Sequence, residues 1–206
     1  FFDKKLSKNN TQSCASCHNP RNSFTDSLRF SLGVDGFSGS RNSMPLFNLA
    51  WNFNDKFSWD GKELSLERQA LEPVRNPIEM HSSWSNVALR LQQDQEYPTM
   101  FLNAFGTERI DSTLVTKAIA QFERTLISGN AKFDQYLLGN TSLNQQEVNG
   151  FTIFMSEDKG DCFHCHGSDN NPLWTDNQFH NNGLDRSFTD LGLGAVTGDP
   201  ADHGKF

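Results

Sequence analysis

The sequence predicts a mostly α-helical protein with long loops, divided into two small domains. Three observations lead to this fold class. Apolar residues recur at helical spacing in several segments, and no segment of any length alternates as a strand would. Gly, Ser, Asn and Pro fill the stretches between these segments. The pattern Cys-x-x-Cys-His occurs twice, at residues 14–18 and 162–166, and each copy belongs to its own helical region.

The helices are placed by apolar periodicity and by capping residues. A short helix is expected at 64–71, and Ser82 or Ser83 can cap a helix that runs through Leu91. Residues 112–128 carry the clearest apolar stripe, ended by Gly129 and formed by Val115, Ala118, Ile119, Phe122 and Leu126.

Two more helices follow, and the domain boundary is placed between them. One is expected at 131–138, and a capping box of Ser142 and Gln145 predicts another that runs through Met155. The boundary is therefore placed near 139–142, which gives domains 1–140 and 141–206. Residues 31–43 form a Gly- and Ser-rich loop, and turns dominate after residue 166, at 169–172, 181–183 and 198–200.

All four cysteines of the chain belong to the two motifs, as Cys14, Cys17, Cys162 and Cys165. Each can form a thioether to a haem vinyl group, and the following His18 or His166 then falls under the iron as axial ligand. A zinc site would need the two pairs to converge from distant parts of the chain. A redox dithiol would be expected in a βαβ setting. The motifs favour two c-type haems, one in each of two cytochrome c-like helical domains.

The composition agrees with large apolar cofactors. Apolar residues make up 35% of the chain, which is low for a packed protein of 206 residues, and 18 Phe could line porphyrin faces. The net charge of −7 argues against binding to nucleic acid or to an anionic membrane. No apolar run has the length of a transmembrane helix. Because neither end has a polar tail, we expect an ordered fragment truncated at both ends.

Several stretches besides the two motifs resemble the bacterial di-haem cytochrome c peroxidases. They cover essentially the whole chain and comprise 2–7, 13–18, 41–42, 59–62 (Trp-Asp-Gly-Lys), 65–70, 76–80 (Asn-Pro-Ile-Glu-Met), 178–181 and 196–200. The resemblance implies a periplasmic enzyme of a family whose members are commonly homodimers, and it implies the reduction of hydrogen peroxide to water. Electrons from a small cytochrome c or cupredoxin would enter at the C-terminal haem and pass to a peroxidatic N-terminal haem.

The same resemblance implies roles for four more residues. Glu79 would carry a proton between the two peroxide oxygens, and the Gln69 amide would bind peroxide or water. Trp59 would lie between the haems and assist electron transfer, and Asn42 would be a ligand of an interdomain calcium ion. By residue type alone, the four could equally be a solvated carboxylate, a water-facing amide, a core indole and a turn residue.

The chain departs from the family pattern in its axial ligands. Many members place a His on the loop after the first motif as sixth ligand, whereas residues 19–80 here contain no His. We therefore expect an N-terminal haem that is open or binds only water, and needs no reductive activation. His81 is the nearest spare imidazole, and an axial role for it is not expected. The family's Met ligand to the second iron lies well beyond the second motif, but all four Met precede His166.

Two other functions remain open at this point. A related di-haem oxidase modifies a protein substrate, as in the maturation of a Trp-derived quinone, and a plain di-haem cytochrome only transfers electrons. The segments at 59–61 and 76–80 favour an enzyme over a carrier, because a carrier needs no acid–base group beside its haem.

Overall fold

A computed structural model describes residues 1–167 and 173–206 of the chain. Helices and loops make up the described part, in which β pairing is limited to isolated bridges at 19/25, 32/38, 57/63 and 192/205. The prediction of a mostly α-helical fold is confirmed. The turn expected at 169–172 lies outside the described residues. No described helix is long and apolar enough to cross a membrane.

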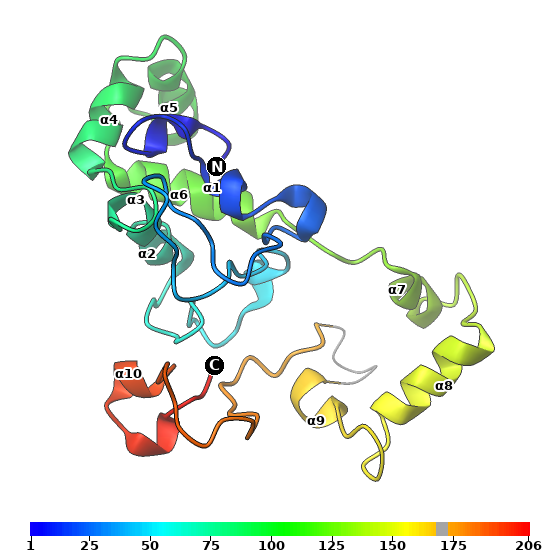
Figure 1. Cartoon of the computed structure of the whole chain (residues 1–206). Helices are drawn as coiled ribbons and strands as arrows, with labels where there is room; N and C mark the ends of the chain where they lie inside the picture. Colours follow the sequence, from blue (N-terminus) through cyan, green and yellow to red (C-terminus); the bar gives the residue numbers. More distant parts are fainter. Residues whose placement is uncertain (168–172) are drawn as a thin grey trace.

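The chain forms an N-terminal lobe (residues 1–128), an arm (129–167) and a returning segment (173–206) (Figure 1). The lobe holds α1 (Cys14–Cys17), α2 (Leu66–Gln69), α3 (Glu72–Arg75), α4 (Trp84–Gln92), α5 (Tyr97–Phe105) and α6 (Ser112–Arg124). The arm holds α7 (Lys132–Leu137), α8 (Gln145–Phe154) and α9 (Phe163–His166), and the returning segment holds α10 (Gly194–Thr197). Short 3₁₀ helices lie at Lys4–Leu6, Pro20–Asn22, Leu49–Trp51 and Pro200–Asp202.

Helix α6 is the central element of the N-terminal lobe. It packs against α2 on one side and α4 on another, around a core of Leu6, Ala70, Val74, Met80, Val87, Leu91, Phe101, Ile110, Val115 and Ile119. Val115 and Ile119 are buried as the predicted stripe requires, but Ala118 is exposed and Ala120 is buried instead. Because α6 contacts neighbours on two sides, its buried face is broader than the predicted stripe.

Several helix boundaries differ from those predicted. The helix expected at 64–71 is observed as α2 followed by α3, whose Pro73 has no N–H to continue the hydrogen bonding of α2. Helix α6 ends at Arg124 rather than 128, where the Leu126 carbonyl accepts a hydrogen bond from Asn48 N–H at 2.8 Å. Helix α5 was not predicted, although Pro98 near its start and Gly106 after its end are typical of a helix.

The start of α8 was also predicted wrongly. Its capping box is formed by Asn144 and Glu147, not by Ser142 and Gln145. The Asn144 side chain accepts a hydrogen bond from Glu147 N–H at 3.0 Å, and the Glu147 carboxylate accepts one from Asn144 N–H at 2.7 Å. This reciprocal pair satisfies two N–H groups at the helix start, so it fixes the first turn two residues later than expected.

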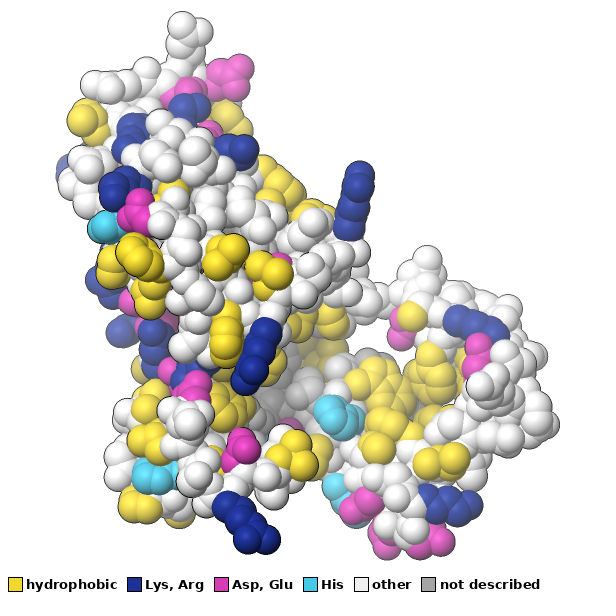
Figure 2. Space-filling model, in the orientation of Figure 1, with side chains coloured by type: hydrophobic (Ala, Val, Ile, Leu, Met, Phe, Trp, Pro, Cys, Tyr) yellow, Lys and Arg dark blue, Asp and Glu magenta, His cyan; other side chains and the backbone are white. Residues whose placement is uncertain are grey.

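The arm is held by aromatic contacts and an ion pair. Lys132 of α7 pairs with Glu147 of α8 at 2.6 Å, and Phe133 packs edge-on against Trp174 at a centroid distance of 5.2 Å. Helix α7 lies before residue 140 and contacts α8, which lies after that residue. The predicted domain boundary at residue 140 stays a prediction. Apolar side chains such as Leu138 and Ile153 remain exposed, and Figure 2 shows apolar atoms gathered on the arm beside histidine. The arm alone therefore buries little apolar surface.

Candidate functional site

A cavity of about 410 Å³ opens in the N-terminal lobe between α1, the loop 31–44, the segment 58–80 and α6. It is lined by the first Cys-x-x-Cys-His motif and by side chains distant from it in sequence. The predicted site residues on its wall are Cys14, Cys17, His18, Asn42, Trp59, Gln69 and Glu79. The structure therefore brings all the predicted residues of the N-terminal site to one cavity.

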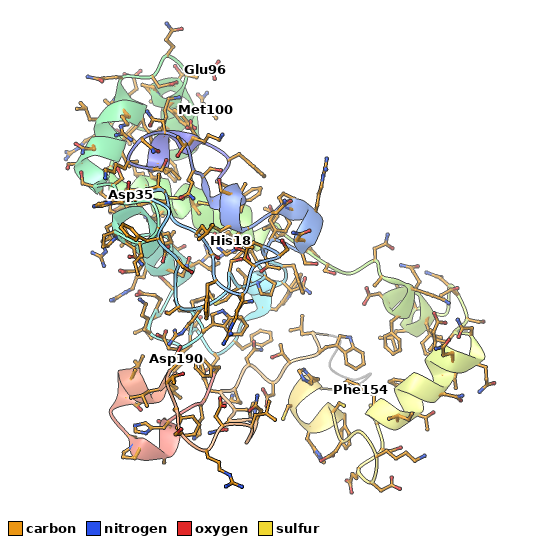
Figure 3. All side chains as sticks on the ribbon, viewed as in Figure 1. His18, Asp35, Glu96, Met100, Phe154 and Asp190 are labelled. Atoms are coloured by element: carbon orange, nitrogen blue, oxygen red, sulfur yellow. The ribbon has the colours of Figure 1, made fainter. Side chains whose placement is uncertain are left out.

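His18 is oriented by two backbone carbonyls and lies within the N-terminal lobe (Figure 3). Its Nδ1 lies 2.9 Å from both the Phe24 and the Met44 carbonyl oxygens, an arrangement that requires the proton on Nδ1. Nε2 is then left as the lone-pair nitrogen. Burial lowers the pKa of His18, which keeps the ring neutral. A neutral imidazole whose second nitrogen is held by carbonyls is the form that ligates a metal.

The two cysteines beside His18 are held as thiols. Burial raises the pKa of Cys14 to about 11 and also raises the pKa of Cys17. Zinc binding and dithiol exchange both use the thiolate, so these environments do not favour them. In the described part of the chain, no three His, Cys, Asp or Glu side chains gather as a metal site. The donor set and the cavity fit a c-type haem held by Cys14, Cys17 and His18.

Glu79 lies on the cavity wall with its carboxylate held by a neighbour. Asn76 Nδ2–H donates to Glu79 Oε1 at 2.8 Å, while Asn76 Oδ1 accepts a hydrogen bond from Ile78 N–H at 3.1 Å. Burial raises the pKa of Glu79, whereas the Asn76 hydrogen bond and the charge of Lys62 act to lower it. Glu79 is only partly enclosed by its neighbours, because part of its side chain faces the open cavity. The arrangement gives an acid–base group a fixed position.

The loop that carries no histidine rests directly on the Glu79 segment. Val34 N–H donates to the Glu79 carbonyl at 2.7 Å, and Gly33 lies so close to the Ile78 carbonyl that no side chain would fit at residue 33. Asp35 on the same loop accepts hydrogen bonds from Lys8 and is paired with His81. His81 is therefore engaged at the surface, away from the cavity lining.

Trp59 and Asn42 meet at the edge of the cavity. The Trp59 indole N–H donates to the Asn42 carbonyl at 2.9 Å, and the Asn42 side chain is exposed. Arg41, next in the chain, bonds Asp60 through Nη1 at 2.8 Å and Asp190 of the returning segment through Nε at 2.7 Å. Through Arg41, the segment that holds Trp59 and Asp60 is thus connected to the returning segment. Gln69 lies partly buried at the end of α2 and also faces the cavity.

Residues 1–142 match the model of a family described as di-haem cytochrome c peroxidase. The chain belongs to this family. It is 40% identical over 198 residues to a "methylamine utilization protein MauG" of Methylorubrum extorquens, covering 94% of this chain and 53% of that protein. It is 33% identical to a "cytochrome c551 peroxidase" of Nitrosomonas europaea, covering 100% of this chain and 61% of that protein.

A solved structure gives the same relationship at the level of the fold. It is of a MauG-like protein associated with microbial copper homeostasis, and it superposes with a TM-score of 0.88 at 33% identity. The match covers 100% of this chain and 65% of that one. The chain therefore spans between half and two thirds of the length of these relatives. Membership of the di-haem peroxidase family implies two c-type haems, in agreement with the two motifs.

The second motif of this family member lies on the arm, well away from the first (Figure 1). Cys162 is partly buried, whereas Cys165 and His166 are exposed on α9. Phe154 of α8 lies beside α9 (Figure 3) and packs edge-on against Trp174 at a centroid distance of 5.6 Å. The second motif is therefore bordered by aromatic rings of the arm, whereas the first motif lines a cavity of the N-terminal lobe.

Sequence reasoning missed three residues that shape the N-terminal site. Asn76 holds the Glu79 carboxylate, and Arg41 binds Asp190 beside the Trp59 segment. Glu123 lines the cavity from α6. Arg41 and Asn76 lie in the stretches 41–42 and 76–80 that carry the family resemblance, but no role was assigned to them, and Glu123 left a signal of its own. It lies four residues after Ile119 on the apolar stripe of α6, where a carboxylate is out of place.

Proposed function

We propose that the chain supplies both haem-binding sites of an oxidoreductase that reduces hydrogen peroxide at the N-terminal site. The reaction consumes two electrons and two protons for each peroxide and forms two waters. One observation carries the proposal: Glu79 and Gln69 share a single cavity with the attachment motif that ends at His18. An electron carrier would need no carboxylate at that position.

The cavity residues account for binding, orientation and proton transfer. Cys14, Cys17 and the His18 Nε2 would hold the haem, which supplies an iron for peroxide binding and electron transfer. The Glu79 carboxylate takes a proton from the near peroxide oxygen and delivers it to the far oxygen, which can then leave as water. The Gln69 amide orients the bound peroxide. Asn76 holds the Glu79 carboxylate in place throughout.

We place electron entry at the second motif and transfer through Trp59. Docking of a small cytochrome c or cupredoxin there, in the periplasm, follows from the family resemblance. The hydrogen bond from the Trp59 indole to Asn42 supports a fixed relay. A calcium ion at Asn42 and a homodimer are part of the same proposal, on the resemblance alone.

The N-terminal site is proposed to stand open without reductive activation. Residues 19–80 hold no histidine, Gly33 is packed on the Glu79 segment, and His81 is paired with Asp35. Absorption and paramagnetic resonance spectra of the oxidised full-length protein should show one high-spin or water-bound iron. Two six-coordinate low-spin irons would contradict an open site.

Protein oxidation is the second candidate function. The MauG protein of Methylorubrum extorquens is 40% identical to this chain, and the peroxidase of Nitrosomonas europaea is 33% identical. The MauG-like solved structure is also 33% identical. An open pocket suits both functions, since both begin with peroxide at the N-terminal haem. Fully loaded protein that consumes no peroxide with any reduced small donor would favour this alternative.

The deciding experiment is peroxide turnover by the full-length, haem-loaded protein with a reduced small cytochrome. Glu79→Gln should lower kcat by roughly 10²- to 10⁴-fold, because it removes the proton-transfer group. Glu108→Gln makes the same change at an exposed position and should leave turnover unchanged. Pyridine haemochrome absorbance should show two haems per chain in all three proteins. Equal turnover in Glu79→Gln would refute the role of Glu79.

A further inference from the structure

Glu123 is a buried carboxyl group whose Oε2 has no hydrogen-bond partner among the described residues. It lies on α6 with 4% of its surface exposed and lines the cavity, as do Cys14 and Ile119. Glu79 reaches the same cavity from the segment after α3. The cavity therefore has a second carboxyl group that the proposed peroxide chemistry does not use.

The charged groups around Glu123 do not neutralise it. The Arg124 guanidinium is held by Glu67 of α2 through an Nη1–Oε1 contact of 2.7 Å, and Arg90 of α4 donates to the carbonyls of residues 5 and 7. The 3₁₀ helix Leu49–Trp51, which also packs on α6, carries no ionisable side chain. Among the described residues, the Phe1 nitrogen also lowers the pKa of Glu123, but only where the chain begins at that residue and the nitrogen carries a charge.

These surroundings favour the protonated form of Glu123. Burial raises the pKa of Glu123 to about 7, with Glu67 acting in the same direction and the Phe1 amino group and Arg124 opposing it. An uncharged amide in place of the Phe1 amino group would leave the pKa higher still. The carboxyl group is thus poised to change its charge near neutral pH, inside the wall of a haem cavity.

We propose that Glu123 is a redox-linked proton site: it binds a proton when the N-terminal haem is reduced and releases it when that haem is oxidised. The inference rests on the proposed haem binding at Cys14, Cys17 and His18. A ferric haem carries one more positive charge than a ferrous haem, and this charge stabilises a nearby carboxylate in a low-dielectric interior. Reduction therefore adds one electron to the iron and one proton to Glu123, with no other bond changed.

The linkage has a consequence for peroxide reduction. The Glu79 carboxylate returns the proton that it takes, so it provides neither of the two protons consumed in forming two waters. Whenever the N-terminal site accepts an electron during turnover, the proton that Glu123 takes up would lie in the same cavity as the reaction. Glu123 would thus bring in a proton together with an electron.

Redox titration of the haem-loaded, full-length protein tests this linkage between pH 5.5 and 8.5. The midpoint potential of the N-terminal haem should fall as pH rises, by up to about 59 mV per tenfold change in proton activity for one electron. Glu123→Gln, which mimics the neutral acid, should remove this slope and leave a higher potential than wild type at the alkaline end. Glu108→Gln, at an exposed position of the same lobe, should keep the wild-type slope.

The possible outcomes separate this inference from the proposed function. Loss of N-terminal haem from the wild-type protein, seen by pyridine haemochrome, would refute the haem site itself. A loaded wild-type protein whose potential does not depend on pH, or a Glu123→Gln variant with an unchanged slope, would refute the linkage alone. If the variant fails to fold, redox-difference infrared spectra of the wild type decide the question. A protonated-carboxyl band must then appear on reduction, and its absence would overturn the inference.

Discussion

Burial shifts the pKa values of the groups in the N-terminal cavity, and individual hydrogen bonds oppose it at some of them. Two carbonyls fix the His18 proton on Nδ1, and one amide from Asn76 holds the Glu79 carboxylate against the effect of burial. Glu123 Oε2 lacks such a donor, and burial raises the pKa of this carboxyl group to about 7. Burial thus raises the pKa of both carboxyl groups of the cavity, and a side-chain hydrogen bond opposes this rise at Glu79 but not at Glu123.

Asn76→Asp should move the acidic limb of the peroxide turnover profile to higher pH. The substitution keeps an acceptor for Ile78 N–H but removes the donor to Glu79 and adds a negative charge. Both changes raise the pKa of Glu79, whose carboxylate form is needed to accept a proton. A lost hydrogen bond to a charged group is equivalent to about 1 to 2 pKa units.

The measurement is kcat/KM for peroxide between pH 4 and 8. Asn103→Asp adds the same charge at an exposed position of α5 and should leave the profile in place. An Asn76→Asp profile that coincides with the wild type would show that Asn76 does not control Glu79.

The motifs could be read from sequence, whereas the residues that tune them could not. Cys14, Cys17 and His18 act through a fixed local spacing, so their chemistry is visible without a fold. The effect of Asn76 depends on a turn that points its amide at Glu79, and the pKa of Glu123 depends on its burial and on Glu67 of α2. Such effects arise from packing and leave little trace in a local pattern.

At the scale of elements, α6 lines the cavity through Ile119 and Glu123, and α4 packs against α6 in the core of the lobe. Leu91 of α4 is 3% exposed in the core, and Leu89, two residues earlier on the same helix, is 57% exposed. The cavity wall at Val74, Met80 and Ile119 belongs to the same core. The position of the cavity residues therefore depends on the packing of these helices.

Leu91→Ala should lower the free energy of unfolding by about 2–5 kcal/mol, since it leaves a void in the core. Leu89→Ala is the matched control and should lower it by less than about 1 kcal/mol, since that side chain is largely in solvent. Denaturant unfolding of the haem-loaded protein, followed by circular dichroism, measures both. Similar losses in the two variants would contradict the described packing of α4.

The elements were predicted best where the helix signals were local. Apolar spacing and Ser83 located α4 closely, and the Asp111–Leu114 cap agrees with a start of α6 at residue 112. The early end of α6 could not be predicted, because it depends on a hydrogen bond from Asn48 N–H, far away in the sequence. For α8, two capping boxes were compatible with the sequence, and only the geometry selects Asn144.

At the scale of the whole molecule, the returning segment joins the N-terminal lobe at Arg41 and Gly61. Arg41 binds both carboxylate oxygens of Asp190, and its guanidinium lies 5.4 Å from the centre of the Phe206 ring. Phe179 packs so closely on Gly61 that a side chain at residue 61 would collide with the ring. The Trp59 segment lies between these two contacts, so its position depends on residues from both ends of the sequence.

Arg41→Gln should loosen the returning segment and slow electron transfer between the haems. The substitution leaves Asp60 and Asp190 without their shared partner, which corresponds to about 1–2 kcal/mol of local stability. Amide hydrogen exchange in residues 188–206 should then be roughly 5- to 30-fold faster. Arg68→Gln, which changes an exposed arginine 3.7 Å from Glu63, is the control and should leave this exchange unchanged. Unchanged exchange in Arg41→Gln would show that Arg41 does not stabilise the returning segment.

The Arg41–Asp190 contact also constrains the order of folding, because it closes a loop of 149 residues. Closing a flexible loop of that length costs on the order of 4 kcal/mol in chain entropy. A partly exposed ion pair contributes too little to meet that cost alone, so the contact must follow the collapse of the N-terminal lobe and the packing of Phe179 on Gly61. Both attachment motifs precede Asp190 in the chain, so each can receive its haem while the chain is still an open loop.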